Sequence, residues 1–155
     1  GQMRIEKKMA ELGLEIPVIE VRTDVPLIPG VKVGNVLYVS GATPAPTAGR
    51  DWAGKVPTDV SAEEAKEAAR WCGVQLLAQA KFVIGDLDRV KRVVKVLGMV
   101  NSETDFGGHP EVINGCSEFF VEVFGEMGRH ARSAGGMASL PSGQAVEIEA
   151  IFEVE

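Results

Sequence analysis

The sequence predicts an α+β domain in which helices and strands form separate layers. Three observations support this. Two segments, 61–84 and 110–124, repeat apolar residues at helical spacing, whereas Val90–Val100 and Val146–Val154 are rich in β-branched residues. The expected element order is β-β-β-α-β-α-β-β, which places the two helices near one side of a sheet. At 155 residues with 45% hydrophobic content, the chain has the size and apolar content of one ordinary domain.

The N-terminal third is expected to hold a short helix followed by extended segments. Residues 1–16 are predicted as a helical extension, with an amphipathic helix over Met3–Leu12, and residues 17–155 as the main domain. Pro17–Val25 is predicted to be extended. Val31–Gly41 is predicted to form two short strands around a tight Gly34-Asn35 turn.

A long loop and a capped helix come next. Thr43–Thr58, with its prolines and glycines, is expected to be a loop, in which Trp52 is interpreted as an anchor in preference to a stacking surface for a substrate. Ser61-Ala-Glu-Glu64 is a capping box that starts a helix running to about Ile84. Gly73 lies inside this helix, and we expect its backbone to pack closely on the sheet.

The C-terminal half alternates strand and helix. The β-branched segment Val90–Val100 is predicted to lie within the sheet and not at its edge. After a loop, Asn101–His109, Pro110 starts the second helix, which ends near Gly125. Two last strands are predicted, over Arg132–Leu140 and Val146–Val154.

Composition excludes several classes of protein. No apolar run approaches the roughly 20 residues that span a bilayer, and the charged N-terminus lacks the apolar core of a secretory signal. The net charge of −6 and the absence of a basic groove argue against nucleic acid as a partner. Cys72 and Cys116 are interpreted as small buried residues, so a cytoplasmic location is expected. With only two histidines, far apart in the sequence, no metal site is predicted.

A few residues could carry chemistry. Arg132 starts a strand among small residues, and its guanidinium matches a carboxylate in a bidentate way, although a surface ion pair is the commoner role of an arginine. Glu147 and Glu149 share one face of the last strand and could supply a general base, or could simply be solvated. Asn114 could orient a ligand from the second helix. Ser40 ends a strand, but no histidine or aspartate partner is placed to make it a nucleophile.

These pieces resemble one known family when they are taken together. The motifs are Gly34-Asn-Val-Leu-Tyr-Val-Ser-Gly41, Gly85-Asp-Leu-Asp-Arg-Val90, Ala131-Arg-Ser133, Leu140-Pro141 and Val146-Glu-Ile-Glu-Ala150. In this order, and over roughly residues 17 to 155, they resemble the RidA/YjgF family, also known as the endoribonuclease L-PSP group. The longer loop after the first hairpin and the N-terminal helix are typical of a divergent branch.

The resemblance implies a chorismate-mutase-like fold with two main helices on one face of a mixed sheet. It also implies a homotrimer with pockets between subunits, and no metal or organic cofactor. The expected activity is hydrolytic deamination of small 2-imino acids to 2-keto acids and ammonia. Arg132 would anchor the substrate carboxylate and Glu147 would position the water. The positions that would line the pocket are Leu27, Ser40, Gly41, Asn114, Ser133 and Ala134.

Two positions depart from the family pattern. Leu27 stands where deaminating members carry a tyrosine, so the pocket loses a hydroxyl and gains apolar surface. Ala134 stands where a cysteine is usual, although that position can act through its backbone. Two alternatives therefore stay open: a non-catalytic or regulatory trimer that binds small carboxylates, and an endoribonuclease, which the net charge argues against.

Overall fold

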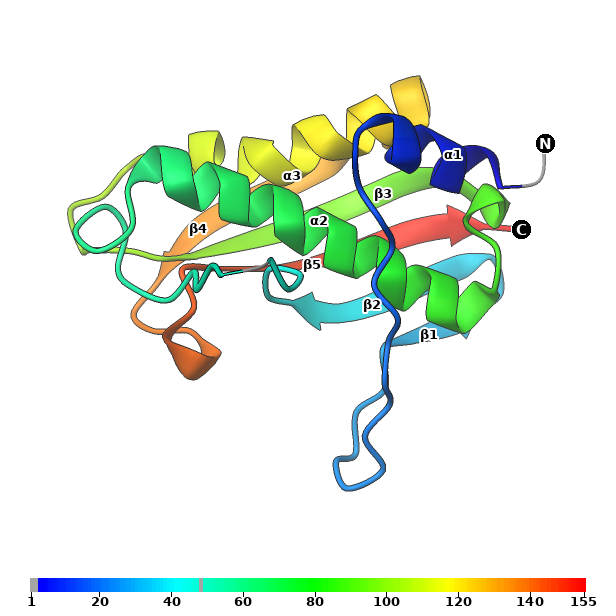
Figure 1. Cartoon of the computed structure of the whole chain (residues 1–155), viewed down its shortest axis with the longest axis horizontal. Helices are drawn as coiled ribbons and strands as arrows, with labels where there is room; N and C mark the ends of the chain where they lie inside the picture. Colours follow the sequence, from blue (N-terminus) through cyan, green and yellow to red (C-terminus); the bar gives the residue numbers. More distant parts are fainter. Residues whose placement is uncertain (1–2, 48) are drawn as a thin grey trace.

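The chain folds into one mixed sheet covered on one side by helices (Figure 1). The computed structural model describes residues 3–47 and 49–155. Within them lie three α-helices and five strands, which confirms the α+β expectation. The elements are α1 (Arg4–Glu11), β1 (Gly30–Val33), β2 (Val36–Ala42), α2 (Ala62–Ile84), β3 (Val90–Asn101), α3 (His109–Phe124), β4 (Ala131–Met137) and β5 (Val146–Val154). None of the helices in these residues is long and apolar enough to cross a membrane.

The sheet has the strand order β1-β2-β5-β3-β4. β3 and β4 are parallel and are connected through α3, whereas the other neighbouring pairs are antiparallel. β3 therefore lies inside the sheet, as its β-branched sequence predicts, and β4 forms an edge. β4 ends at Met137, three residues earlier than expected, because Leu140-Pro141 leads into a short 3-10 turn over Pro141–Gly143.

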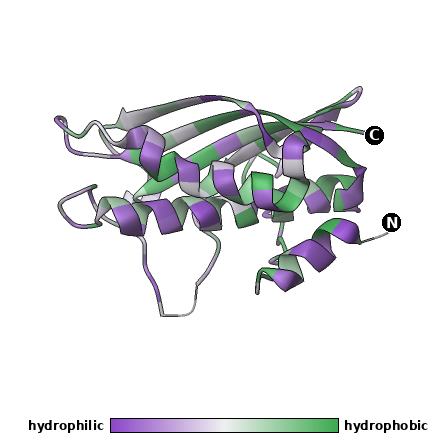
Figure 2. Ribbon diagram, turned by 90° about the horizontal axis from the view of Figure 1, so that it is seen from above, coloured by the Kyte–Doolittle hydropathy of each residue, from purple (hydrophilic) through white to green (hydrophobic). Residues whose placement is uncertain are grey.

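The core lies between the helices and one face of the sheet (Figure 2). β5 shows the alternation that causes this arrangement. Val146, Ile148 and Phe152 are fully buried beneath the helices, while Glu149, on the opposite face, is exposed. Burial of one face only is the expected behaviour of strands with a period-2 apolar pattern.

Helix α2 begins and ends where its sequence predicts. The Ser61 hydroxyl accepts from the Glu64 backbone N–H, and the Glu64 carboxylate accepts from the Ser61 N–H, both at 3.1 Å. Gly85 follows its last residue with a positive φ of 84°. The expectation for Gly73 is wrong in one respect. Its close neighbour is Phe119 of α3 and not the sheet, because the missing side chain lets the two helices approach each other.

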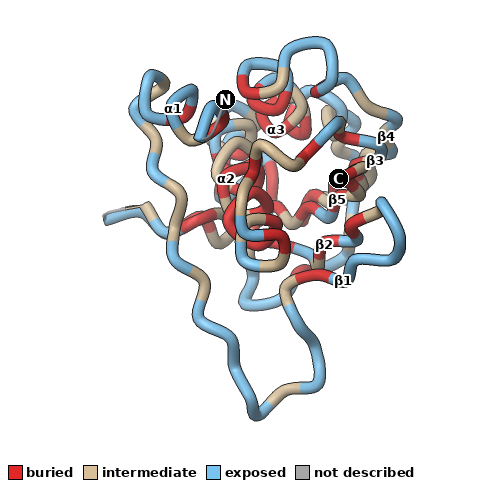
Figure 3. Tube along the Cα trace, turned by 90° about the vertical axis from the view of Figure 1, so that its right-hand side faces the viewer, coloured by how far each residue is buried: buried red, intermediate tan, exposed pale blue. Residues whose placement is uncertain are grey.

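The segment between α1 and β1 differs from the prediction. Pro17–Val25 forms no strand but belongs to an arm, residues 14–29, whose first part lies along α2 and whose remainder extends away from the body (Figures 1 and 3). Prolines interrupt the arm, and no strand pairs with it within the described residues. Val18 is 91% exposed and Leu27 62% exposed, whereas Leu14 and Ile16 pack against the core, so only the projecting part of the arm leaves its apolar residues largely exposed.

The long loop and the N-terminal helix both pack on the body. In the described part of Thr43–Thr58, which leaves out residue 48, the chain forms isolated bridges only. Trp52 is buried in the core, which confirms its role as an anchor. Helix α1 buries Ile5 and Met9 completely. The Asp88 carboxylate accepts from its first backbone N–H groups at 2.8 and 2.9 Å and so fixes its start.

Candidate functional site

Arg132 is turned toward the helix layer by two hydrogen bonds. It is the second residue of β4 and is half-buried. Its Nη1 donates to Oδ1 of Asn114 at 2.7 Å and to Oγ of Ser117 at 3.1 Å, both on α3. Asn114 and Ser117 are three residues apart, a spacing that places them on the same face of a helix. The structure therefore brings Arg132 and Asn114 together, as expected of two residues of one site.

Most of the guanidinium is left free for a ligand. Arginine has five N–H donors, and within the described part of the chain only Nη1 donates to protein. No carboxylate of these residues forms a salt bridge with Arg132. The guanidinium borders a cavity of about 380 Å³, lined by Ser117, Glu118, Val121, Arg129, His130 and Arg132. Glu118, the carboxylate in this lining, is paired with Lys66 at 3.3 Å, and a half-buried arginine without a salt-bridge partner of its own can accept an anionic ligand.

The neighbours of Arg132 on β4 lie on different faces. Ser133 points to the opposite face and is exposed. Ala134 shares the face of Arg132 and packs against the core. Both residues are therefore close to Arg132 in the chain, but only Ala134 lies on its side of the sheet.

Glu147 lies on the open face of the sheet, away from the helices. Its neighbours in the chain, Val146 and Ile148, are completely buried on the helix face. The pairing of β2 with β5 is irregular between Val39 and Ala42, and Gly41 of this stretch lies against the Glu147 side chain. A Cβ on Gly41 would stand only 2.5 Å from the Oε2 of Glu147, so a glycine is needed for this approach. Partial burial, and secondarily the charge of Glu149, raises the pKa of Glu147 above its usual value.

A second cavity, of about 420 Å³, opens between the arm and β2. Leu27, Ser40 and Gly41 all line it, so the structure brings these three expected residues together. The Ser40 hydroxyl donates to the Ile28 carbonyl at 2.6 Å, and the Ser40 carbonyl accepts from Nε2 of Gln79 at 2.9 Å. Ser40 is thus engaged in holding the arm against β2.

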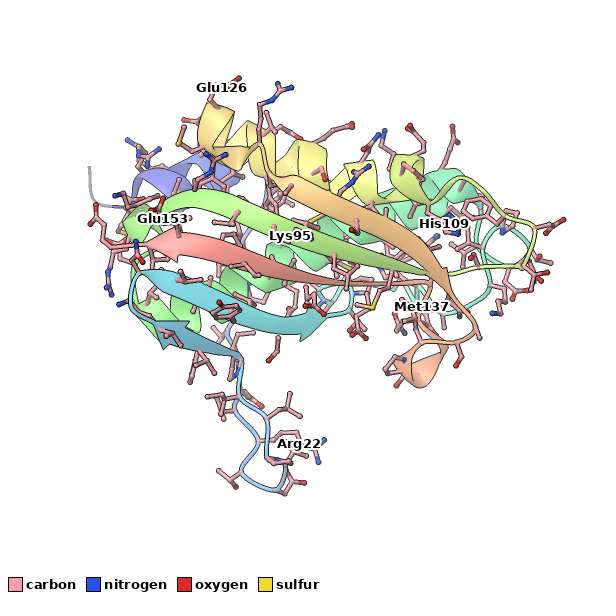
Figure 4. The ribbon with its side chains drawn as sticks, turned by 180° about the vertical axis from the view of Figure 1, so that it is seen from behind. Arg22, Lys95, His109, Glu126, Met137 and Glu153 are labelled. Atoms are coloured by element: carbon pink, nitrogen blue, oxygen red, sulfur yellow. The ribbon has the colours of Figure 1, made fainter. Side chains whose placement is uncertain are left out.

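The expected site residues fall into two groups that one chain does not join. Arg132 of β4 pairs with Val96 of β3, and Val96 in turn pairs with Ala150 of β5. All three side chains lie on the helix face of the sheet. Glu147 lies two strands away from Arg132, at a strand spacing of about 4.8 Å, and on the other face. Figure 4 shows the open face, with Lys95 of β3 in its middle and Arg22 near the tip of the arm.

Two residues beside Arg132 were not expected from the sequence. Oγ of Ser117 lies 2.9 Å from Nε2 of His130, and Nδ1 of His130 lies 2.6 Å from the carbonyl oxygen of Gly128. The available signals were weak: His130 is two residues before Arg132, and Ser117 is three residues after Asn114. Among the described residues, no three His, Cys, Asp or Glu side chains could together hold a metal ion. Cys72 and Cys116 are both free and buried, and burial raises the pKa of both thiols.

Comparisons with known proteins place the chain among similar folds. Residues 6–147 match the family described as "YjgF/chorismate mutase-like, putative endoribonuclease". The chain is 39% identical over 152 residues to protein TCP17 of Trypanosoma cruzi, which covers 97% of this chain and 94% of that protein. It is 42% identical to the structure of protein Atu1372 of Agrobacterium tumefaciens, with a TM-score of 0.88 and coverage of 97% and 94%.

A RidA structure is also similar. RidA from the Antarctic bacterium Psychrobacter sp. PAMC 21119 is 26% identical, with a TM-score of 0.56 and coverage of 90% of this chain and 94% of that one. The five-stranded mixed sheet with its helices is accordingly the chorismate-mutase-like fold that the motifs predict. The family match spans both groups of site residues up to Glu147, and the chain therefore belongs to the RidA/YjgF family.

Proposed function

We propose that the protein hydrolyses small 2-imino acids to 2-keto acids and ammonia at sites shared between the subunits of a homotrimer. The observation that carries the proposal is the guanidinium of Arg132, which faces a cavity with most of its donors free. A 2-imino acid has a carboxylate adjacent to its C=N carbon. An arginine that holds the carboxylate therefore also fixes the position of the reacting carbon.

The chemistry asked of the protein is modest. Water adds to the electrophilic C=N carbon as the π electrons move to nitrogen, and a carboxylate takes one proton from that water and returns it to the nitrogen, which gives a neutral carbinolamine. The hydroxyl proton of the carbinolamine then passes to the same nitrogen, the C–N bond breaks, and ammonia leaves behind the 2-keto acid. Glu147 is the proposed base, and its raised pKa suits a group that both accepts and returns a proton. Arg132 remains protonated throughout.

The separation of the two groups supports a site shared between subunits. Arg132 and Glu147 project from opposite faces of one sheet, so a single chain cannot place both on one small substrate. A ring in which the Arg132 cavity of one subunit meets β2 and β5 of the next would bring them together. The exposed apolar residues Val31, Val33 and Tyr38 on β1 and β2 support a buried role for this region in an assembly.

A non-catalytic carboxylate binder is the second candidate, and Leu27 favours it. Leu27 lines the cavity at the arm and is largely exposed, where deaminating relatives are expected to carry a tyrosine hydroxyl. Such a protein would keep the Arg132 site and bind 2-keto acids without turning over imines.

An activity assay separates the two candidates. An amino-acid oxidase would generate 2-iminobutanoate in situ, and 2-oxobutanoate formation would be followed with wild-type protein, Arg132→Ala and the control Arg4→Ala. The proposal expects acceleration by the wild type and the control, and none by Arg132→Ala. Saturable 2-oxobutanoate binding without acceleration would establish the binder instead.

Subunit mixing tests the shared site. Arg132→Ala and Glu147→Gln proteins are each expected to be inactive. When they are unfolded together and refolded at equal ratio, about a quarter of the sites in random trimers would receive an intact Arg132 from one subunit and an intact Glu147 from its neighbour. Recovery of about that share of activity supports the trimer. If light scattering shows trimers but no activity is recovered, the two residues do not act together across subunits, and the shared site is refuted.

A further inference from the structure

The cavity beside Arg132 has a second polar wall, made of Ser117 and His130. Ser117 Oγ stands between Nη1 of Arg132, at 3.1 Å, and Nε2 of His130, at 2.9 Å. On its other side, Nδ1 of His130 lies 2.6 Å from the Gly128 carbonyl oxygen. The family match assigns no role to Ser117 or His130.

The direction of each hydrogen bond can be worked out. A carbonyl oxygen only accepts, so Nδ1 of His130 must carry the proton that it donates to Gly128. Burial lowers the pKa of His130 and outweighs the hydrogen bond to Gly128, which raises it, while the nearby charge of Arg132 lowers it further, so the imidazole is neutral near pH 7. Nε2 is then a lone-pair acceptor, and the Ser117 hydroxyl donates to it. The Ser117 oxygen is left to accept from Arg132.

The far end of this chain of hydrogen bonds is rigid. The ring of His130 packs edge-on against Phe120, with centroids 6.0 Å apart and planes at 81°. Gly128 is buried, and a Cβ there would come 2.3 Å from the Phe120 carbonyl oxygen, so this turn is pressed against α3. The position of the Gly128 carbonyl is therefore set by backbone packing.

We infer that Ser117 and His130 are positioning residues, which hold the guanidinium of Arg132 in the orientation that presents its free edge to the ligand carboxylate. The inference rests on the proposed function in one respect only, the carboxylate as the ligand. Ser117 and Asn114 together fix Nη1, and His130 fixes the Ser117 hydroxyl. A guanidinium held by Asn114 alone can rotate about that single contact.

Isosteric pairs of substitutions separate hydrogen bonding from packing. Ser117→Thr keeps a hydroxyl that Ser117→Val lacks, and His130→Gln keeps an acceptor that His130→Met lacks. His109 provides the matched control, because its Nε2 also lies near a serine, Ser102 at 3.2 Å, but at the start of α3. His109→Gln and His109→Met should leave Arg132 unaffected.

Two measurements follow, the first without any ligand. Nitrogen-15 relaxation should show the Arg132 side-chain Nε as ordered in the wild type, in Ser117→Thr and in His130→Gln, and as mobile in Ser117→Val and His130→Met. Long-range proton–nitrogen spectra should show His130 protonated on Nδ1. An equally ordered Arg132 in Ser117→Val and His130→Met, or a proton on Nε2 of His130, would overturn the inference.

The second measurement is the dissociation constant for 2-oxobutanoate by calorimetry. Ser117→Val and His130→Met should weaken binding roughly tenfold, as expected for a misplaced charged donor, and their hydrogen-bonding counterparts should restore it. Equal weakening within each pair would mean that only packing matters. A wild type that binds no keto acid refutes the proposed ligand, whereas the relaxation result still decides whether Ser117 and His130 position Arg132.

Discussion

Asn114 holds Arg132 through a neutral acceptor: its Oδ1 takes a hydrogen bond from Nη1 at 2.7 Å. Its own Nδ2 donates to the Glu111 carboxylate at 3.4 Å, which identifies the oxygen as the atom that faces Arg132. A neutral partner orients the guanidinium but leaves its positive charge uncompensated. That charge is what would attract a ligand carboxylate.

Asn114→Asp should therefore impair binding while it preserves the contact. The new carboxylate would form an ion pair with Arg132 and compete with the ligand for the same cation. We expect 2-oxobutanoate affinity to fall roughly tenfold or more, the size of one charged hydrogen bond, and thermal stability to change little, because repulsion between the new carboxylate and Glu111 offsets the new ion pair. Calorimetric titration and a melting curve measure the two effects. Unchanged affinity in Asn114→Asp would show that the ligand does not use the Arg132 charge.

Glu147→Gln should separate stability from activity. The pKa of Glu147 is raised above its ordinary 4.5, so the folded state binds this proton more tightly than the unfolded state does. The charged form thus costs stability at pH 7. The cost disappears as the pH falls through the raised pKa and below 4.5. Glu147→Gln should be more stable than wild type at pH 7, with the advantage lost near pH 4.

The activity of Glu147→Gln should fall, although its stability at pH 7 should rise. Loss of a general base lowers rates by about 10² to 10⁴, so deamination should nearly vanish while 2-oxobutanoate binding persists. Glu149→Gln, on the same face and exposed, is the control and should keep most of the activity.

Denaturant unfolding at pH 4 and pH 7 measures the stability of Glu147→Gln against wild type. A Glu147→Gln protein less stable than wild type at pH 7 would contradict the burial argument.

Gly41→Ala tests whether the position of Glu147 matters. The added methyl would lie 2.5 Å from Oε2 of Glu147. A carboxylate at the end of a flexible side chain can move aside at little cost, so the fold should survive with a melting temperature within a few degrees of wild type. The displaced carboxylate should lower deamination by about 10²-fold, the effect of a misplacement of about 1 Å.

Gly107→Ala is the matched control for Gly41→Ala. A Cβ at Gly107 meets no heavy atom within 4 Å and no positive φ is required there, so neither stability nor activity should change. Normal activity of Gly41→Ala at normal stability would show that the close approach of Glu147 to β2 is not needed for turnover.

Local signals in the sequence located most elements of the fold. The capping box at Ser61 fixed the start of α2, and Gly85 its end, because caps act on the nearest backbone groups. The same local logic was wrong for the arm. Val18 and Val21 have β-branched side chains, but a strand also needs a partner strand. Within the described residues none pairs with them, and the local sequence carries no signal of that.

The candidate site was harder to predict than the fold, because its contacts join distant segments. The family motif located Arg132, but the contact of His130 with Ser117 spans 13 residues and depends on how α3 lies against β4. Likewise, Arg132 and Glu147 look like close partners in sequence, yet strand pairing puts them two strands apart on opposite faces. Strand order and register decide such relationships.

The crossing of α2 and α3 yields a prediction in which two effects oppose each other. A Cβ on Gly115 would come 1.9 Å from the backbone carbonyl oxygen of Lys66, so α3 could not keep its present distance from α2. Alanine in place of a helical glycine gains about 1 kcal/mol of helix propensity. Overpacking costs about 1–3 kcal/mol, and backbone cannot move aside as a side chain can. The overpacking cost should therefore lie at the upper end of this range, so that Gly115→Ala loses about 1–2 kcal/mol of unfolding free energy in denaturant titrations, whereas Gly107→Ala loses none. An unchanged or raised midpoint would mean that the helices can separate at less cost than the propensity gain.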